Sequence, residues 1–415
     1  MDDPAWLQGK TLLVVDACSE KKSFVFKALH ELGIHLICLY TYEAEWIKEY
    51  VDEWIVADVY DYNKALEWVG KYMWSWKNTI DWVITYREDA VILTSMIVDK
   101  LWILGIHFDQ ASKLKNKYLL RQMYGSEDYN KSIKIYSKED IDIIDSHIWS
   151  YPIVMKPVFG ADSSNVVKVN SKEEALYHYT LIQNKIHDDV NLRDWFEILA
   201  EKYIAGQEVD MDIVMQDGIM KFFSITDNDP TTEPYFLESW QNTPTRLSID
   251  AQEKLQALAL KIISDVGISD ACLHFEAKYT WSWAEIIETN LRMWWARVHS
   301  FVYNARWVDL VVESVKVALW ISTFINKPSH PLAYLVGKHL LPERSWIITS
   351  IHVPQEVYDD PRILEVKILT QVWQEIFTPP DGFGDHGWIT VKWDSPEQAD
   401  EALVRLKNLC NIVVE

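Results

Sequence analysis

The first hundred residues alternate between short apolar runs, rich in β-branched side chains, and longer segments with helical spacing. The runs are TLLVVDA, HLICLY, DEWIVAD and DWVITY; the helical pattern KKSFVFKALHELG follows the first run, and EDAVILTSMIVDKL follows the last. Strands that alternate with helices in this way form a parallel sheet covered by helices. The sequence therefore predicts an α/β unit that is Rossmann-like in outline. The turn after the first run, VVDACSEKK, lacks the glycine fingerprint, so dinucleotide binding there is poorly supported.

The remaining chain is predicted to add α+β units. A single helix is expected at 112–125, followed by a β-rich module in YPIVMKPVFGADSSNVVKV and a hairpin that turns on Asp217 and Gly218. An amphipathic helix is expected at 248–267. The segment PSHP at 328–331 marks a boundary. We expect a Rossmann-like domain at 1–108, a domain at 109–327 with lobes at 109–200 and 201–327, and a small α+β domain at 328–415.

Charge and cysteine usage exclude several classes of function. A formal net charge of −22 over 415 residues argues against sequence-independent nucleic-acid binding, which needs clustered Lys and Arg. The four cysteines are far apart and show no metal-ligand spacing. The N-terminal segment MDDPAWLQGK does not resemble a signal peptide, and no apolar run is long enough to span a bilayer. We expect a cytoplasmic protein without nucleic-acid or membrane partners; a homodimer is left open.

The segment HFEAKYTWSWAEIIETNLR, from His274 to Arg292, is predicted to form a magnesium site. If its two apolar stretches pair as antiparallel strands, Glu276, Glu288 and Asn290 point toward one place. Magnesium prefers such oxygen ligands and often lies between one or two carboxylates and the phosphates of a nucleotide. Arg292 would project the same way and could hold a phosphate or carboxylate. The alternative is a hairpin with a solvated polar face.

Two further segments could bind a nucleotide. Lys156 ends an apolar strand just before the loop FGADSSN, so the lysine could bind inner phosphates while the loop covers the outer ones. Lys117 could supply a second cation. In EKYIAGQE, a strand that stops pairing after Tyr203 would leave backbone groups free to read a purine edge, and Glu208 could accept bonds from ribose hydroxyls. Taken alone, each of these patterns also occurs as ordinary structure.

The order of these segments resembles the ATP-grasp superfamily, in which ATP lies between two α+β lobes. The resemblance covers about residues 10–325 and implies that the first unit is a pre-ATP-grasp domain. It implies that Lys117 and Lys156 bind phosphate, together with a loop that includes Ser163 and Ser164. It further implies roles for the remaining residues: an adenine hinge at Glu201, Lys202, Tyr203 and Ile204, a ribose ligand at Glu208, and ligands for Mg²⁺, or alternatively Mn²⁺, at Glu276, Glu288 and Asn290.

Within this superfamily the chain resembles carnosine synthase and related dipeptide ligases. The resemblance is carried by VITYREDAV, VMKPVFGADSSNVVKV, EVDMDIV, TDNDPTTEPYFLESWQNTPT, IIETNLRM and ARWVDLV. It implies an ATP-dependent carboxylate-amine ligase that joins two amino acids through an acylphosphate. Glu238 and Arg292 are candidate substrate contacts, and Arg292 would also stabilise the tetrahedral oxyanion. The alternatives are an ATP-grasp ligase or carboxylase with another nucleophile, and a pseudoenzyme that serves as a scaffold.

The chain is poor in glycine and rich in tryptophan. It contains 21 Trp and only 13 Gly, although Gly averages about 7% of residues in ordinary proteins. Where the family pattern expects glycine, Trp294 and Trp295 follow Arg292, and Trp281 stands at the expected hairpin turn. An indole does not tolerate positive φ or close backbone approach cheaply. We therefore hypothesise that many of these tryptophans stand at glycine positions, through a stop-type codon read as Trp or through deliberate substitution.

Overall fold

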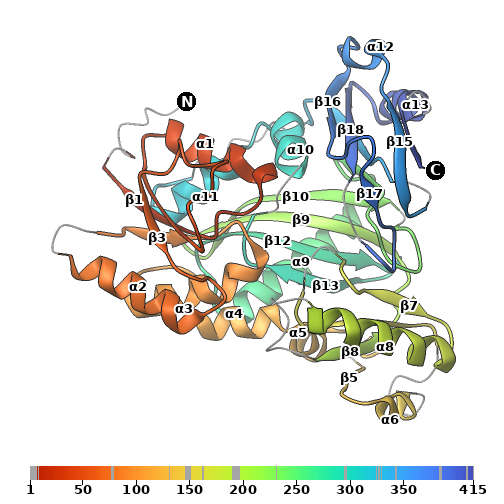
Figure 1. Ribbon diagram of the computed structural model, residues 1–415, viewed down its shortest axis with the longest axis horizontal. Helices are drawn as coiled ribbons and strands as arrows, with labels where there is room; N and C mark the ends of the chain where they lie inside the picture. Colours follow the sequence, from red (N-terminus) through yellow and green to blue (C-terminus); the bar gives the residue numbers. More distant parts are fainter. Residues whose placement is uncertain are drawn as a thin grey trace.

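The fold was determined from a computed structural model of the 415-residue chain. Figure 1 shows the N-terminal part of the chain on the left, the C-terminal part at the upper right, and a sheet of long strands from the middle of the chain between them. The structure describes residues 7, 9–75, 79–129, 131–144, 151–160, 163–188, 197–229, 231–293, 297–323, 325, 328, 330–341, 344–382, 386–407 and 410–414.

The N-terminal unit is a four-stranded parallel sheet with the strand order β3-β2-β1-β4. Along each strand, successive buried side chains point to opposite faces of the sheet. Helices cover both faces. This arrangement confirms the predicted Rossmann-like α/β unit. Its strands are β1 (Thr11–Val15), β2 (His35–Tyr40), β3 (Glu53–Val56) and β4 (Trp82–Ile84), and its helices are α1 (Ser23–Glu31), α2 (Tyr62–Trp74) and α3 (Val91–Leu101).

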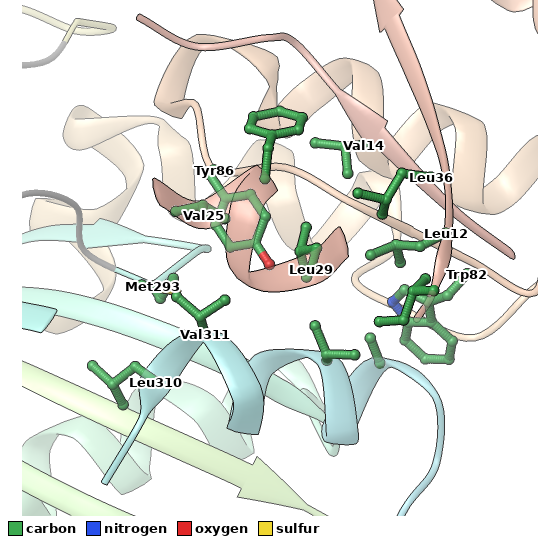
Figure 2. Packing of buried hydrophobic residues seen from close by; sticks show 14 of the residues in the cluster. Leu12, Val14, Val25, Leu29, Leu36, Trp82, Tyr86, Met293, Leu310 and Val311 are labelled. Carbon is green, nitrogen blue, oxygen red and sulfur yellow. The ribbon is translucent and has the colours of Figure 1, made fainter. Parts of the chain in front are cut away.

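A helix from much later in the chain covers one face of this N-terminal sheet. Helix α11 (Leu310–Ala318) packs its apolar side against α1 and against inward-facing residues of β1 and β2, as Figure 2 shows. The cluster also contains Met293, which lies three residues after the end of the strand that carries two of the predicted metal ligands. The Rossmann-like unit is therefore held firmly against the segment that follows Arg292.

The second unit is a small four-stranded sheet with the strand order β5-β8-β6-β7. Its central strands β6 and β8 run antiparallel, and Lys156 lies opposite Leu199. An apolar core fills the space between this sheet and α8. The elements are β5 (Ser132–Ile135), β6 (Ile153–Pro157), β7 (Val167–Val169), β8 (Ile198–Lys202), α6 (Lys138–Ile141) and α8 (Lys172–Asp188).

The third unit is a large sheet with the strand order β13-β12-β9-β10-β11-β14-β18-β16. One face is apolar around Met211, Ile213 and Phe275 and packs against α9. Because side chains alternate along a strand, the residues between these apolar ones point to the opposite face. The first five strands are β13 (Ala284–Asn290), β12 (Ala271–Tyr279), β9 (Gln207–Gln216), β10 (Ile219–Asp229) and β11 (Trp240–Thr243), and the helices are α9 (Ile249–Val266) and α10 (Arg297–Arg306).

Segments after residue 328 extend the large sheet. Strand β14 pairs with β11, and β18 and β16 follow in order. The C-terminal segment, expected as a small α+β unit, thus shares its main sheet with the preceding unit. The elements are β14 (Tyr334–His339), β15 (Trp346–His352), β16 (Ile363–Ile368), β17 (Glu375–Ile376), β18 (Gly387–Trp393), β19 (Asn411–Val414), α12 (Gln355–Tyr358) and α13 (Pro396–Lys407).

The prediction of a single helix at 112–125 is wrong about the number of helices. The chain forms two helices, α4 (Phe108–Lys115) and α5 (Lys117–Tyr124), with Asn116 between them in an extended conformation. The Asn116 side chain accepts a hydrogen bond from the Leu119 backbone N–H at 3.1 Å, so it caps the second helix. The break places Lys117 in the first turn of α5.

Two other local predictions are confirmed. Asp217 and Gly218 form the two-residue turn between β9 and β10, both with positive φ. Helix α9 begins after Ser248, whose hydroxyl accepts from the Ala251 N–H, and ends at Gly267 in the left-handed conformation. Among the described residues, no helix is both long and apolar enough to cross a membrane.

Candidate active site

The two strands predicted to carry the metal ligands pair as expected. In the antiparallel hairpin β12–β13, Glu276 lies directly opposite Glu288, and His274 lies opposite Asn290. The Asn290 side-chain amide donates a hydrogen bond to Glu276 Oε1 at 3.1 Å. The three predicted oxygen-bearing side chains are therefore brought together on one face of the large sheet.

Negative charge is concentrated around Glu276. Burial raises the pKa of Glu276 well above its usual range, and nearby carboxylates raise it further, in the order Glu288, Glu238 and Glu208. A divalent cation would offset this repulsion, and its preference for oxygen ligands fits the residues present. Glu238, predicted as a substrate contact, accepts a hydrogen bond from Gln241 at 2.9 Å.

The described residues hold no group of three or more His, Cys, Asp or Glu side chains placed to bind a metal ion without other ligands. A site built from two carboxylates and one amide oxygen would need further ligands, such as water or the phosphates of a nucleotide. The residues therefore fit a metal ion that arrives with a nucleotide better than a permanently bound structural ion.

The neighbouring strand β9 supplies acidic residues that sequence reasoning did not single out. Asp210 pairs with Glu276 across the sheet, and Asp212 pairs with His274. His274 is fully buried, with Nδ1 3.2 Å from Asp212 Oδ1 and Nε2 3.6 Å from Asp210 Oδ1. The alternating acids of EVDMDIV were the signal for this row, because every second residue of a strand shares a face.

Lys117 bridges the small sheet and the metal hairpin. Its ammonium nitrogen lies 2.9 Å from Glu288 Oε1 and donates a hydrogen bond to the Gly160 carbonyl oxygen at 2.8 Å. Gly160 belongs to the loop predicted to cover phosphates. The lysine thus lies between that loop and a predicted metal ligand, where a cation could contact a phosphate.

Lys156 is buried at the end of β6 and points toward β8. Its ammonium nitrogen is 2.6 Å from Glu201 Oε1, and the other Glu201 oxygen lies 3.0 Å from Arg121 Nε. Burial alone would raise the pKa of Glu201, but the charges of Lys156 and Arg121 hold it at about 2. Glu201, predicted as the first residue of the hinge, uses its carboxylate to pair with both cations.

The predicted hinge follows the end of β8. Strand β8 ends at Lys202, and the Tyr203 N–H still donates to the Pro152 carbonyl on the neighbouring chain segment, so pairing reaches Tyr203 as predicted. The Tyr203 hydroxyl donates to Glu233 at 2.7 Å, and the Ile204 side chain is buried. These contacts fix the course of the chain just before the next strand.

The chain passes very close to β12 at Gly206. A Cβ at this position would lie 2.4 Å from the Tyr279 carbonyl oxygen, and the residue has φ +154°. Two residues later, Glu208 forms an ion pair with Lys278 at 3.2 Å. Glycine is therefore required for the hinge to run against the large sheet.

The predicted phosphate loop is only partly described. Ser163 and Asn165 both have positive φ, at 52° and 62°, and Val166 donates to the Ser163 carbonyl. Ala161 and Asp162 lie outside the described residues. Ser164 is half-buried beside Ser163 in this turn, so both predicted serines lie on the segment that follows Lys156.

Arg292 is buried against a residue that sequence reasoning missed. Its Nε lies 2.8 Å from Glu88 Oε2, and Lys115 lies 2.5 Å from the other Glu88 oxygen. Burial would raise the pKa of Glu88, but Lys115 and Arg292 hold it at about 2. Glu88 lies in YREDA, which formed part of the family resemblance without a role being assigned. Trp294 and Trp295, also predicted to affect the site, lie outside the described residues.

Comparison with known proteins supports the expected family. Residues 149–294 match the family model described as the ATP-grasp domain. Carnosine synthase 1 of Homo sapiens is 24% identical over 97% of this chain and 50% of its own length. Alanine–anticapsin ligase of Bacillus subtilis is 24% identical over 48% of this chain and 45% of its own. The chain thus spans about half the length of these relatives.

A solved structure matches the whole chain. The L-amino acid ligase from Bacillus licheniformis superposes with a TM-score of 0.86 and 20% identity, over 98% of this chain and 99% of that one. The match includes the N-terminal parallel sheet, the small sheet and the large sheet, since almost the entire chain is covered. The expected combination of an α/β unit with α+β units in an ATP-grasp arrangement is confirmed.

Proposed function

We propose that this chain, which carries an ATP-grasp domain at residues 149–294, is an ATP-dependent ligase that joins the carboxylate of one amino acid to the amine of another. One observation carries the proposal: Lys117 contacts both the phosphate loop and Glu288, so phosphate-binding and metal-binding elements meet at one point. The names of the similar proteins, which are amino-acid ligases, support the same reaction.

We assign ATP to the space between the small and large sheets. Lys156 and Lys117 would bind its phosphates together with Ser163 and Ser164, and the hinge from Glu201 to Ile204 would face the adenine. Glu208 would accept hydrogen bonds from the ribose. Glu276, Glu288 and Asn290 would hold Mg²⁺, with Mn²⁺ as an alternative, and the charge around Glu276 supports a divalent ion there.

The amino-acid substrates are assigned to the region around Arg292. Its guanidinium can bind a carboxylate by two parallel hydrogen bonds. Glu88 Oε2 lies 2.8 Å from Arg292 Nε and would hold the guanidinium in place for this contact. Glu238 adds a second carboxylate near Glu276. Opposite charges side by side suit an amino acid, which carries both charges itself.

The reaction follows from these assignments. Lys117 and Lys156 would offset charge on the phosphates while the substrate carboxylate oxygen attacks the γ-phosphorus, and the bond to ADP breaks. The amine of the second amino acid then attacks the carbonyl carbon of the acylphosphate. Arg292 would stabilise the tetrahedral oxyanion before phosphate leaves and the amine loses its proton. When bound, Mg²⁺ supplies further charge neutralisation at the phosphates.

The test is release of ADP and phosphate from Mg-ATP with single amino acids and with pairs. Release that requires a pair, with a dipeptide detected by mass spectrometry, would support the proposal. Release with one acid plus ammonia or bicarbonate would instead indicate a different nucleophile. A folded protein that binds nucleotide and releases nothing with any combination would indicate a scaffold.

A matched pair of variants separates the site from general effects on folding. Glu288→Gln removes a proposed metal ligand that is also the partner of Lys117. Glu313→Gln changes a carboxylate on α11 that pairs with Lys316 and is not a proposed ligand. Phosphate release should fall steeply in Glu288→Gln and remain within about twofold of the unmodified protein in Glu313→Gln. Equal activity of both variants would contradict the assignment.

A further inference from the structure

Helix α5 presents two cations, one turn apart, to the space between the two sheets that would enclose ATP. Lys117 contacts Gly160 of the small unit and Glu288 of the large sheet. One turn later, Arg121 is only 2% exposed. Its Nε lies 3.0 Å from Glu201 Oε2 in the small sheet, and its Nη1 lies 3.8 Å from Glu285 Oε2 in the large sheet. Arg121 is therefore a buried link between the two sheets.

This link continues to the lysine proposed to bind phosphate. The second Glu201 oxygen lies 2.6 Å from Lys156, so the side chains form a series from Glu285 through Arg121 and Glu201 to Lys156. Each member is almost fully buried. In a low-dielectric interior, loss of one charge leaves its neighbours without compensation, and they must move or change protonation.

We propose that Arg121 is a positioning residue for the nucleotide site: through Glu201 it fixes the Lys156 ammonium, and through Glu285 it sets the separation of the two sheets. The proposal rests on the proposed binding of ATP. Arg121 itself is held by carboxylates on both sides and does not need to touch the nucleotide. Lysine at this position could keep a charge but could not contact both carboxylates in the geometry of a planar guanidinium.

The experiment measures Mg-ADP binding by calorimetry, and the Michaelis constants for ATP and for the amino acids, in Arg121→Lys and Arg121→Met. We expect nucleotide affinity to fall roughly tenfold or more in Arg121→Met and less in Arg121→Lys, because one charged hydrogen-bonding partner is lost. The Michaelis constants for the amino acids should change little. Arg246→Lys, which alters an ion pair with Asp400 away from the site, is the matched control.

Unchanged Mg-ADP affinity in folded Arg121→Met would overturn the proposal. If that variant does not fold, Arg121→Lys and Glu285→Gln decide, and both must then weaken nucleotide binding more than Arg246→Lys does. Failure of the unmodified protein to bind Mg-ADP would refute the proposed function. That result differs from normal binding by the unmodified protein with unchanged binding by the variants, which would refute only the positioning role of Arg121. An equal rise in the Michaelis constants for ATP and for the amino acids would also contradict the positioning role, because general destabilisation of the fold would produce that result.

A second inference rests on backbone conformation. Among the described residues, eleven that are not glycine have positive φ, and five of these are tryptophan. All five indoles are largely exposed, so burial contributes little to holding these residues in the left-handed region, although the Trp307 ring stacks on Tyr303 at 5.2 Å. They are Trp102 (φ 55°, 94% exposed), Trp281 (66°, 72%), Trp307 (59°, 64%), Trp320 (57°, 57%) and Trp373 (71°, 77%).

These tryptophans occupy turn positions that normally favour glycine. Trp102 ends α3, and the next residue, Ile103, donates its N–H to the Val98 carbonyl, as in helices that terminate at a left-handed glycine. Trp320 follows α11 in the same way, with Ile321 donating to the Lys316 carbonyl. In this chain, Gly33 and Gly267 end α1 and α9 in the left-handed conformation, both with φ 73°. Trp102 and Trp320 adopt the same left-handed conformation.

We infer that these five positions are glycine in the protein as its source organism makes it. A UGA codon translated as tryptophan, where the source reads glycine, would produce this pattern together with the 21 Trp and 13 Gly of the chain. A tryptophan costs energy in the left-handed region and gains almost nothing by burial here, whereas glycine adopts that region freely. By sequence, the inference extends to Trp294 and Trp295, directly beyond Arg292.

Peptide mass spectrometry of the protein isolated from its source tests this directly. We expect glycine masses at all five positions and UGA at the five codons of the gene. Tryptophan at any of these positions would overturn the inference for that position, and UGG codons throughout would overturn it entirely. The same digest reports residues 294 and 295, which decides the form of the enzyme that the activity assays should use.

Discussion

Replacement of Trp102 by glycine should stabilise the protein, although the change removes the largest side chain. Trp102 has φ 55° and ψ 38° at the end of α3, and its indole is 94% exposed. The substitution therefore sacrifices almost no buried apolar surface. It relieves the contact between Cβ and backbone that makes the left-handed region unfavourable for residues other than glycine.

The expected gain in the free energy of unfolding follows from two opposing effects. Relief of the left-handed conformation contributes about 1–2 kcal/mol, and the greater freedom of glycine in the unfolded chain removes roughly 0.5–1 kcal/mol of this. The net gain is about 0.5–1 kcal/mol for Trp102→Gly. The five left-handed tryptophans lie in five separate turns. Their effects should therefore add to about 2.5–5 kcal/mol in a fivefold glycine variant.

Thermal and urea unfolding followed by far-ultraviolet circular dichroism measure this gain, because tryptophan fluorescence would itself change with the substitutions. The matched control is Trp68→Gly, which lies within α2 and is also partly exposed, at 47%. Glycine inside a helix should cost about 1 kcal/mol. If Trp102→Gly and Trp68→Gly destabilised the protein equally, the argument from backbone conformation would be refuted.

Three other predictions concern the site. Glu276→Gln should lower kcat for ATP-dependent ligation at least roughly 100-fold, because several kcal/mol of charge stabilisation depend on the metal ligands; titration of activity with Mg²⁺ measures the effect. Gly206→Ala should raise the Michaelis constant for ATP, since the new Cβ would lie 2.4 Å from the Tyr279 oxygen, whereas Gly70→Ala should leave it unchanged because that Cβ meets only the end of Lys100. The pKa of Glu201 is lowered from 4.5 to about 2, so its ion pairs stabilise the fold above about pH 4.5, and that contribution is lost as the pH falls toward 2. Acid unfolding of Glu201→Gln should lack this part of the pH dependence, and an identical acid profile would contradict the buried ion pair.

Local patterns predicted the parts of the site that lie on one continuous element. The hairpin β12–β13 was predictable because alternation alone places Glu276, Glu288 and Asn290 on one face. Helix α9 was predictable from the amphipathic spacing of its apolar residues. The break at Asn116 was not, because the helical spacing of the apolar residues continues across it and only the side-chain cap distinguishes the two helices.

Contacts between distant segments could not be predicted from the sequence. Glu88 and Arg292 are separated by about two hundred residues, and their ion pair depends on how α11 holds the N-terminal sheet against the segment after β13. Arg121 reads in the sequence as an ordinary helix residue, yet it is buried between two sheets. Likewise, nothing local indicates that β14 joins the edge of β11, because an edge strand can pair with any complementary partner.

The ion pairs of the site suggest how nucleotide and metal depend on each other. Lys117 pairs with Glu288, a proposed metal ligand, and Lys156 pairs with Glu201. ATP that entered without Mg²⁺ would bring negative charge close to Glu276 and Glu288, and drawing Lys117 toward the phosphates would leave Glu288 uncompensated. When Mg²⁺ enters with ATP, the ion can compensate Glu288 while Lys117 contacts phosphate. Calorimetry should therefore show much weaker binding of ADP with EDTA than with Mg²⁺, and this difference should shrink in Glu288→Gln. Equal affinity under both conditions would show that Lys117 and Glu288 do not exchange partners.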